Sequence, residues 1–212
     1  MKHAAVIVDS KETLGIRDVV LQHMAYLPGW DLVFFHGSRN RAYIKNQLAG
    51  IPVKILALPE PSFPWEVYNR IFTSMGFWEI LAFFDKVLIF HPDSGILTDR
   101  IKDFMQWDYV GAPWTFQQHG GNGGFSLRTP KVMLEILRRY KYGGMIDGNE
   151  DVWFSNVMFN NNIGRLAPRA VCSEFSVEAI FQLGTFGYHA IEKWLTPDQV
   201  NQIMTQYDTD NN

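Results

Sequence analysis

The first half of the chain alternates between short runs of apolar residues and longer stretches in which apolar residues recur at helical spacing. Each short run ends at a polar or turn-forming residue, which is typical of buried strands. The pattern predicts strands at residues 4–8, 31–36, 53–58 and 86–90, and helices between them at residues 12–27, 38–48 and 66–84. Strands that alternate with helices indicate an α/β fold, in which helices cover both faces of a mostly parallel sheet.

The second half of the chain is less regular. Its apolar pattern predicts two strands followed by two helices, at residues 109–112, 125–127, 130–142 and 150–160. The stretch after residue 161 has no clear periodicity. The polar end of the chain predicts a frayed tail at residues 206–212. We therefore expect one domain over residues 1–205, with no internal repeat or linker.

A glycine-rich loop separates the two later strands, with the sequence Gly120-Gly121-Asn122-Gly123-Gly124-Phe125. Such a density of glycine indicates turns with positive φ, or a close approach of the backbone to another group. Two interpretations are open: a loop whose backbone amides approach a ligand, and a glycine-rich hairpin. The loop is not a dinucleotide-binding motif, because it precedes a strand-like Phe-Ser-Leu rather than a helix.

Acidic residues follow two of the predicted strands. Asp9-Ser10 follows the first strand, and His91-Pro92-Asp93-Ser94 follows the fourth. In open α/β sheets, ligands bind beyond the carboxyl ends of the strands. An aspartate there can hold a divalent cation that neutralises a diphosphate, or it can begin a turn or cap a helix. Both interpretations of Asp93 are open at this point.

Two further features are candidates for chemistry. Glu150-Asp151 opens a predicted helix, where acids favour the helix dipole and where one carboxylate could act as a general base. Adjacent helical residues project about 100° apart, so at most one of the pair would face a cleft. His189 follows Gly187-Tyr188 and is either a ligand or a structural histidine.

Composition and charge narrow the class of protein. The formal net charge is −3, and no run of Lys or Arg is longer than Arg138-Arg139, which argues against nucleic acid as a partner. The lone Cys172 excludes an internal disulfide, favours a reducing compartment and is typical of core packing. The first apolar run is too short for a signal peptide, and no apolar stretch is long enough to span a bilayer, so we expect neither a signal peptide nor a membrane span. We expect a soluble, cytoplasmic protein.

Taken in order along the chain, these segments match a known pattern. The motifs that carry it are Phe77-Trp78, Gly111–Trp114, Gly121–Arg128, Glu150-Asp151 and Gly187-Tyr188-His189. On these motifs the chain resembles the GT-A fold glycosyltransferases over residues 4–194. It looks closest to an uncharacterised GT-A-like family with the sequence GNGGFSLR, which is the most specific part of the match. The resemblance implies a Rossmann-like three-layer α/β/α domain.

The resemblance also implies roles for the candidate residues. Asp93 would hold a divalent cation, Mn²⁺ or Mg²⁺, at the D-x-D position, with His189 as the C-terminal histidine ligand. His91 replaces the first acid of D-x-D, so diphosphate oxygens and waters would complete the metal site. Asp151 would be the catalytic base, and Glu150 would contact the acceptor or hold the loop. The residues implied to lie against the donor are Asp9, Ser10, His91, Asp93, Asn122, Gly123, Gly124 and Phe125.

The implied reaction is an inverting, metal-assisted transfer of a sugar from a nucleoside-diphosphate sugar, most commonly a UDP-sugar, to a hydroxyl of a glycan or another acceptor. Two other functions are open: a nucleotidyltransferase that makes sugar nucleotides, and a catalytically silent module that binds them. Such nucleotidyltransferases usually carry a glycine-rich loop after the first strand. This chain has Asp9-Ser10-Lys11-Glu12 there, which argues against that function.

Overall fold

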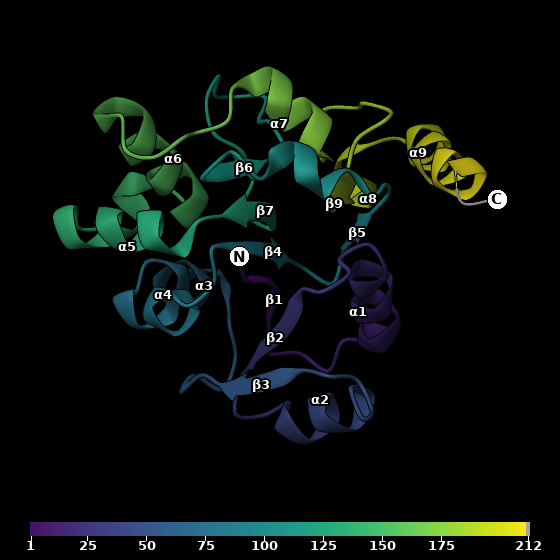
Figure 1. Ribbon diagram of the computed structural model, residues 1–212, viewed down its shortest axis with the longest axis horizontal. Helices are drawn as coiled ribbons and strands as arrows, with labels where there is room; N and C mark the ends of the chain where they lie inside the picture. Colours follow the sequence, from purple (N-terminus) through teal and green to yellow (C-terminus); the bar gives the residue numbers. More distant parts are fainter. Residues whose placement is uncertain (211–212) are drawn as a thin grey trace.

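The computed structural model describes residues 1–210 of the protein, apart from the side chains of residues 145 and 206–210. A six-stranded sheet runs through the middle of the molecule (Figure 1). Its strands, in spatial order, are β3 (Lys54–Ala57), β2 (Asp31–His36), β1 (His3–Asp9), β4 (Lys86–Phe90), β7 (Phe125–Arg128) and β6 (Tyr109–Gly111). The first four are parallel, and β7 is antiparallel to β4 and β6. The predicted α/β fold with a mostly parallel sheet is confirmed.

This topology brings distant parts of the sequence to one edge of the sheet. The carboxyl ends of β1 and β4 lie side by side because the two strands are parallel neighbours. Because β7 is antiparallel, its first residue, Phe125, pairs with Phe90, the last residue of β4. The glycine-rich loop that precedes Phe125 therefore lies beside the residues that follow Phe90.

Helices cover both faces of the sheet and form two hydrophobic cores with it. One face is covered by α3 (Trp65–Phe72), α4 (Met75–Leu81), α5 (Pro130–Arg139) and α6 (Glu150–Asn161). The other is covered by α1 (Ile16–Ala25), α2 (Arg41–Gln47), the 3-10 helix Arg100–Phe104 and α7 (Arg169–Phe175). Alternate residues of β1 enter opposite cores, Val6 the first and Ile7 the second. Burial on both faces is why the parallel strands read as continuous apolar runs.

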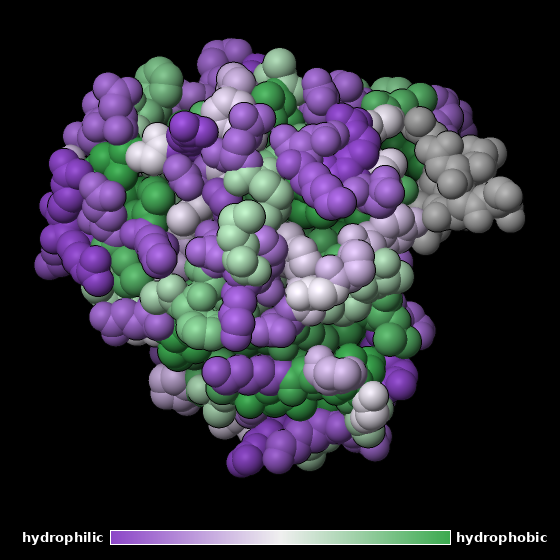
Figure 2. Space-filling view, in the orientation of Figure 1, coloured by the Kyte–Doolittle hydropathy of each residue, from purple (hydrophilic) through white to green (hydrophobic). Residues whose placement is uncertain are grey.

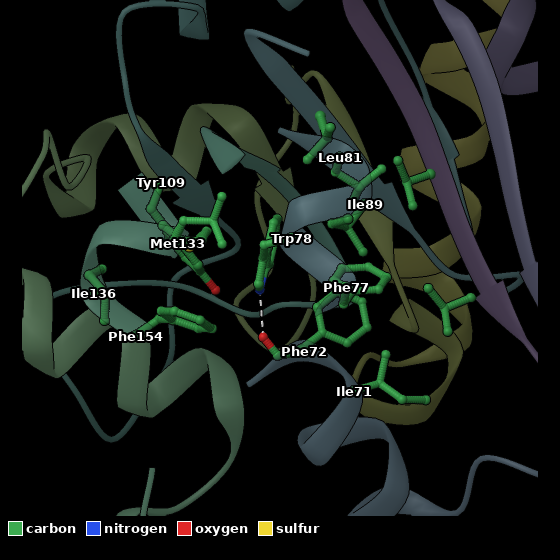
Figure 3. Packing of buried hydrophobic residues seen from close by; sticks show 14 of the residues in the cluster. Ile71, Phe72, Phe77, Trp78, Leu81, Ile89, Tyr109, Met133, Ile136 and Phe154 are labelled. Carbon is green, nitrogen blue, oxygen red and sulfur yellow. Dashed lines mark hydrogen bonds between the residues drawn. The ribbon is translucent and has the colours of Figure 1, made fainter. Parts of the chain in front are cut away.

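The first core is rich in aromatic side chains. Figure 3 shows Phe72, Phe77, Trp78 and Phe154 gathered between the helices. Trp78 is fully buried, and its indole N–H donates a hydrogen bond of 2.6 Å to the carbonyl oxygen of Phe72. The indole therefore packs in the core without an unsatisfied polar atom, which a buried tryptophan requires.

A second, three-stranded sheet connects the C-terminal part of the chain to the strand-end edge. Its strands, in spatial order, are β5 (Ser94–Ile96), β9 (Gly187–His189) and β8 (Ser176–Val177). Ser94 pairs with His189, so this sheet brings the late histidine to the end of β4. Two helices follow, α8 (Ile191–Trp194) and α9 (Pro197–Asp210), and α9 lies at the periphery of the molecule (Figure 1). Of the frayed tail predicted at 206–212, the backbone to Asp210 belongs to α9, and residues 211–212 lie outside the described residues.

The long helix predicted at residues 66–84 is wrong, because α3 ends at Phe72 and α4 begins at Met75. The hydroxyl of Thr73 donates to the carbonyl of Asn69, and that of Ser74 to the carbonyl of Ile71. Such side chains compete with the backbone for helical carbonyls. Ser74 then caps α4 by accepting a hydrogen bond from the N–H of Phe77.

Other predicted boundaries shift for local reasons. The helix predicted at 12–27 begins only at Ile16, after Gly15 in the left-handed region with φ 74°. The helix predicted at 130–142 ends at Arg139, because Tyr140 is extended. The chain after residue 161 is more regular than predicted, with α7, β8, β9, α8 and α9. Its strands are too short to show a period of two. No helix in the described part of the chain is long and apolar enough to cross a membrane.

Candidate functional site

His91, Asp93 and His189 form a cluster of potential metal ligands at the end of β4. One ligand atom from each residue lies within 4.8 Å of the others. His189 Nε2 is 3.4 Å from Asp93 Oδ1 and 3.2 Å from His91 Nδ1. The cluster therefore combines the predicted metal residues Asp93 and His189 with His91.

A second residue orients each imidazole of the cluster. Glu178 Oε1 lies 3.0 Å from His189 Nδ1, and the hydroxyl of Tyr68 hydrogen-bonds to His91 Nε2. Carboxylate–histidine pairs of this kind fix the orientation of metal-ligating rings. Burial and the neighbouring His189 lower the pKa of His91 to about 3, so this ring is neutral, as a metal ligand must be.

Asp93 divides its two carboxylate oxygens between different partners. Oδ1 faces His189, and Oδ2 accepts a hydrogen bond of 2.6 Å from Lys193 Nζ. The contact with His189 and the hydrogen bond from Lys193 hold the pKa of Asp93 well below its usual range. The carboxylate is therefore ionised and available as a ligand at neutral pH.

The donor atoms of the cluster indicate what kind of cation it could hold. Mg²⁺ sites are built from oxygen ligands, whereas imidazole nitrogen suits first-row transition ions. Two imidazoles and one carboxylate, each held in orientation, fit a divalent transition ion.

Asp151 lies in the first turn of α6 and is only 8% exposed. Its Oδ2 accepts the N–H of Gly123 at 2.8 Å, and its Oδ1 accepts the N–H of Val152 at 2.8 Å. Burial and the charge of Glu150 raise the pKa of Asp151 to about 7. An ordinary aspartate has a pKa of about 3.9, so Asp151 is a stronger base than most and is ready to exchange a proton near neutral pH.

Glu150 has a different partner from its neighbour. Both of its oxygens accept hydrogen bonds of 2.7 Å from the guanidinium of Arg128, which is completely buried. The rings of Tyr109 and Phe72 lie 4.8 and 5.3 Å from that guanidinium. Arg128 also contacts the carbonyl of Gly123. Of the two roles implied for Glu150, this geometry matches holding the loop, because its side chain is only 4% exposed and both oxygens face the buried guanidinium.

The glycine-rich loop contacts the site so closely that two of its residues leave no room for a side chain. A Cβ on Gly123 would lie 2.5 Å from Glu150 Oε1, and one on Gly124 would overlap the ring of His189. Their N–H groups donate to Asp151 and to Asn122 Oδ1, at 2.8 and 2.7 Å. The loop connects the antiparallel pair β6 and β7, and these two amides bond to the protein rather than standing free to bind phosphate.

Two adjoining pockets open along the strand-end edge. The first, of about 470 Å³, is lined by Asp9, Ser10 and Asp93. The second, of about 440 Å³, is lined by Asp151 and His189 and by three residues of the loop, Asn122, Gly123 and Gly124. The side chains that line both pockets are Lys11, Phe63, Tyr68, His91 and Lys193. The metal-ligand cluster and the candidate base therefore lie in one continuous cleft.

Three predicted donor-binding residues have structural roles that the sequence did not indicate. Asp9 accepts hydrogen bonds from Lys11 N–H and the Thr13 hydroxyl, and Ser10 accepts one from the N–H of Phe63. Asp9 thus shapes the wall of the first pocket through a local turn, and Ser10 through a contact with the distant Phe63. The prediction that Phe125 faces the donor is wrong, because its side chain is fully buried in the second core. The alternation along β7 points it away from the cleft.

Sequence reasoning missed Tyr68, Glu178 and Lys193. Glu178 and Lys193 come from the stretch that showed no periodicity, and Tyr68 lies within a predicted helix. No local motif distinguishes these residues from surface or core positions. Cys172 is buried as predicted, and burial raises the pKa of its thiol to about 11, which makes it an inert packing residue.

Residues 53–189 match a protein family described as "Protein of unknown function (DUF5672)". No curated protein matches the chain. The matched region contains the metal-ligand cluster, the glycine-rich loop and the acidic pair, and it ends at His189. It leaves out β1 and β2, and with them Asp9 and Ser10.

Proposed function

Because this chain belongs to the DUF5672 family, whose description gives no activity, we propose its function from the site: inverting transfer of a sugar from a nucleoside-diphosphate sugar to an acceptor hydroxyl by a GT-A-type glycosyltransferase. The observation that carries the proposal is the position of Asp151. This carboxylate of raised pKa lines a pocket that continues into the one beside the metal-ligand cluster. Displacement at an anomeric carbon requires a base on one side of the sugar and a group that neutralises the leaving charge on the other.

The chemistry of Asp151 follows from its contacts. Each carboxylate oxygen accepts one backbone N–H and retains a lone pair, so it can accept a further hydrogen bond from an acceptor hydroxyl. The hydroxyl oxygen then forms a bond to the anomeric carbon, and its proton passes to Asp151. The bond from that carbon to the diphosphate breaks, and its electron pair stays on the phosphate oxygen. Attack from the opposite side inverts the anomeric configuration.

Positive charge near the leaving diphosphate has two sources in this proposal. A divalent cation held by His91, Asp93 and His189 would supply Lewis-acid stabilisation of the leaving group. Lys11 and Lys193 line both pockets, and their ammonium groups attract phosphate oxygens as point charges. The nucleoside would occupy the pocket of Asp9, Ser10 and Phe63, and the acceptor the pocket of Asp151.

The test compares wild type with Asp151→Asn on a panel of UDP-sugars in Mn²⁺. We expect the variant to lose turnover by about 10²–10⁴-fold, since general-base catalysis contributes that much. It should retain the thermal shift that UDP produces, because a ligand that binds the native state raises its stability. Asp198→Asn, at an exposed position in α9, is the matched control and should retain turnover.

The outcomes separate the possible functions. Loss of UDP binding in step with turnover would overturn the assignment of Asp151 as the base. Binding of UDP-sugars by wild type, without release of UDP under any condition, would favour a silent binding module. Absence of any stabilisation by nucleoside diphosphates would overturn the proposed function as a whole.

A further inference from the structure

A further groove lies beside the cleft rather than in it. It has a volume of about 690 Å³ and runs between α3, the start of α4 and the end of α5. This volume falls within the range of about 300–1,000 Å³ that is typical of small-molecule sites. None of the sequence motifs contributes a residue to its lining.

The groove is strongly basic in a protein whose net charge is −3. Among its lining residues are four cations, Arg70, Arg138, Arg139 and Lys141, against one acid, Glu66. In Figure 2, hydrophilic residues lie along the edge of the molecule where Figure 1 places α5, with hydrophobic residues between them. This accumulation of positive charge on one face favours an anionic ligand.

Part of this charge has no partner within the protein. Arg138 and Lys141 are exposed, and their side chains make no ion pair or hydrogen bond to any described residue. Arg139 pairs with Glu135 at 2.9 Å on the helix surface, and Arg70 only reaches Glu60 at 4.0 Å. Exposed pairs of this kind contribute little stability, so the cations are available to a ligand at low cost.

The groove is joined physically to the pocket of Asp151. Trp65 and Asn69 line both. Asn69 Oδ1 accepts the N–H of Glu150 at 2.8 Å, and Tyr142, another lining residue, packs edge-on against Trp153 of α6. A ligand in the groove would therefore extend toward the first turn of α6, where Asp151 lies.

We propose that this groove binds an anionic saccharide acceptor, a carbohydrate that bears carboxylate or phosphate groups, and directs its hydroxyl toward Asp151. The proposal rests on the proposed function, since it assigns the acceptor of that reaction. Trp65 is 43% exposed at the junction with the Asp151 pocket and provides an apolar face on which a sugar ring can stack. The guanidinium groups of Arg138 and Arg70 match carboxylate and phosphate oxygens in a bidentate geometry.

A saccharide fits the groove better than a nucleic acid does. The cations are confined to one groove of limited volume, whereas a nucleic acid needs a basic surface that follows its backbone. Tyr140 and Tyr142 are the other aromatic residues of the groove, and Tyr142 is held by a hydrogen bond from its hydroxyl to the carbonyl of Gly148. The aromatic residues are too few to stack a series of bases.

The experiment measures binding of trigalacturonate, of a phosphorylated maltotriose and of neutral maltotriose to the full chain by calorimetry. The double variant Arg138→Glu/Lys141→Glu reverses the unpartnered charges of the groove. Arg41→Glu/Lys45→Glu, at exposed positions in α2, changes the net charge equally and is the matched control. We expect wild type and the control to bind an anionic trisaccharide at least about tenfold more tightly than maltotriose in low salt, and the groove variant to lose this preference. The two anionic probes identify which charged group the groove prefers.

Three results would overturn the inference: equal affinity for maltotriose and both anionic probes, equal weakening by the control, or a single-stranded RNA that binds more tightly than every saccharide. Stabilisation of wild type by UDP and Mn²⁺ is measured in parallel. UDP binding without charge-dependent saccharide binding would overturn the groove assignment alone. Charge-dependent saccharide binding without UDP binding would instead overturn the transferase, and with it the acceptor role.

Discussion

Asp151→Asn removes a carboxyl group that is costly to ionise in the folded protein. Burial and the charge of Glu150 raise its pKa to about 7, while in the unfolded chain an aspartate has a pKa of about 3.9. Between these values the folded state holds one more proton than the unfolded state. The contribution of Asp151 to stability is therefore greatest at low pH, and between these two pKa values it falls by about 1.4 kcal/mol per pH unit as the pH rises.

The magnitude follows from the two pKa values. Between about pH 5 and about pH 8, this group should cost wild type about 2–3 kcal/mol of the free energy of unfolding. Asparagine cannot ionise, so the variant lacks this loss. One of the two N–H groups that face the carboxylate, from Gly123 and Val152, would meet the amide NH₂ instead. That penalty of about 1–3 kcal/mol is independent of pH and cancels when the pH dependence is compared.

The assay is urea unfolding at a series of pH values, followed by the fluorescence of the seven tryptophans. All other titrating groups are common to both proteins, so the difference between wild type and variant isolates Asp151. Glu79→Gln, which removes an exposed carboxylate from α4, is the control. A wild-type-minus-variant difference that stays constant from about pH 5 to about pH 8 would refute the reasoning. It would mean that the N–H groups and Arg128 offset the cost of burial.

Three other predictions concern the parts that surround Asp151. Gly123→Ala should destabilise the protein by about 1–3 kcal/mol in urea unfolding, because the added Cβ would press on the buried Arg128–Glu150 ion pair. The control is Gly76→Ala in α4, which has open space around it and should be neutral or stabilising. Glu150→Gln should cost about 3–5 kcal/mol of the free energy of unfolding, because it leaves Arg128 buried without a charged partner. The double variant Glu150→Met/Arg128→Met should cost less than the sum of the costs of Glu150→Met and Arg128→Met. A cost of the double variant equal to the sum of the two single costs would argue against a coupled ion pair. Glu178→Gln should weaken Mn²⁺ binding by about 10–100-fold in calorimetry, without changing affinity for UDP alone. Unchanged Mn²⁺ affinity would show that Glu178 does not support a metal ligand.

Much of the main sheet could be predicted because its information is local. The strands predicted at residues 31–36 and 86–90 have the same bounds as β2 and β4, since apolar runs between turn residues mark buried strands. The acidic pair at the start of α6 and the residues after β4 were also found, because strand ends and helix starts are visible as changes in pattern. The break between α3 and α4 was missed, because Thr73 and Ser74 are compatible with a helix until their hydroxyls find carbonyl partners.

The roles of the individual site residues required the fold. Glu150 and Asp151 are adjacent acids in the sequence, and nothing local says which one pairs with Arg128 and which one keeps a raised pKa. Their division of roles comes from the turn of α6, which points the two side chains toward different neighbours. The same holds for Glu178, whose importance lies only in its distance from His189.

By itself, the sequence determined the alternation of strands and helices, and with it the α/β class, because burial of a strand or of a helix face leaves a periodic trace within a few residues. Only the tertiary structure decided which chemical groups meet. His91 and His189 are 98 residues apart and face each other because β4 leads into β5, which pairs with β9. Gly123 and Gly124 are glycines because the ion pair and the histidine occupy their side-chain space. These contacts depend on the register between distant strands, and no local pattern records that register.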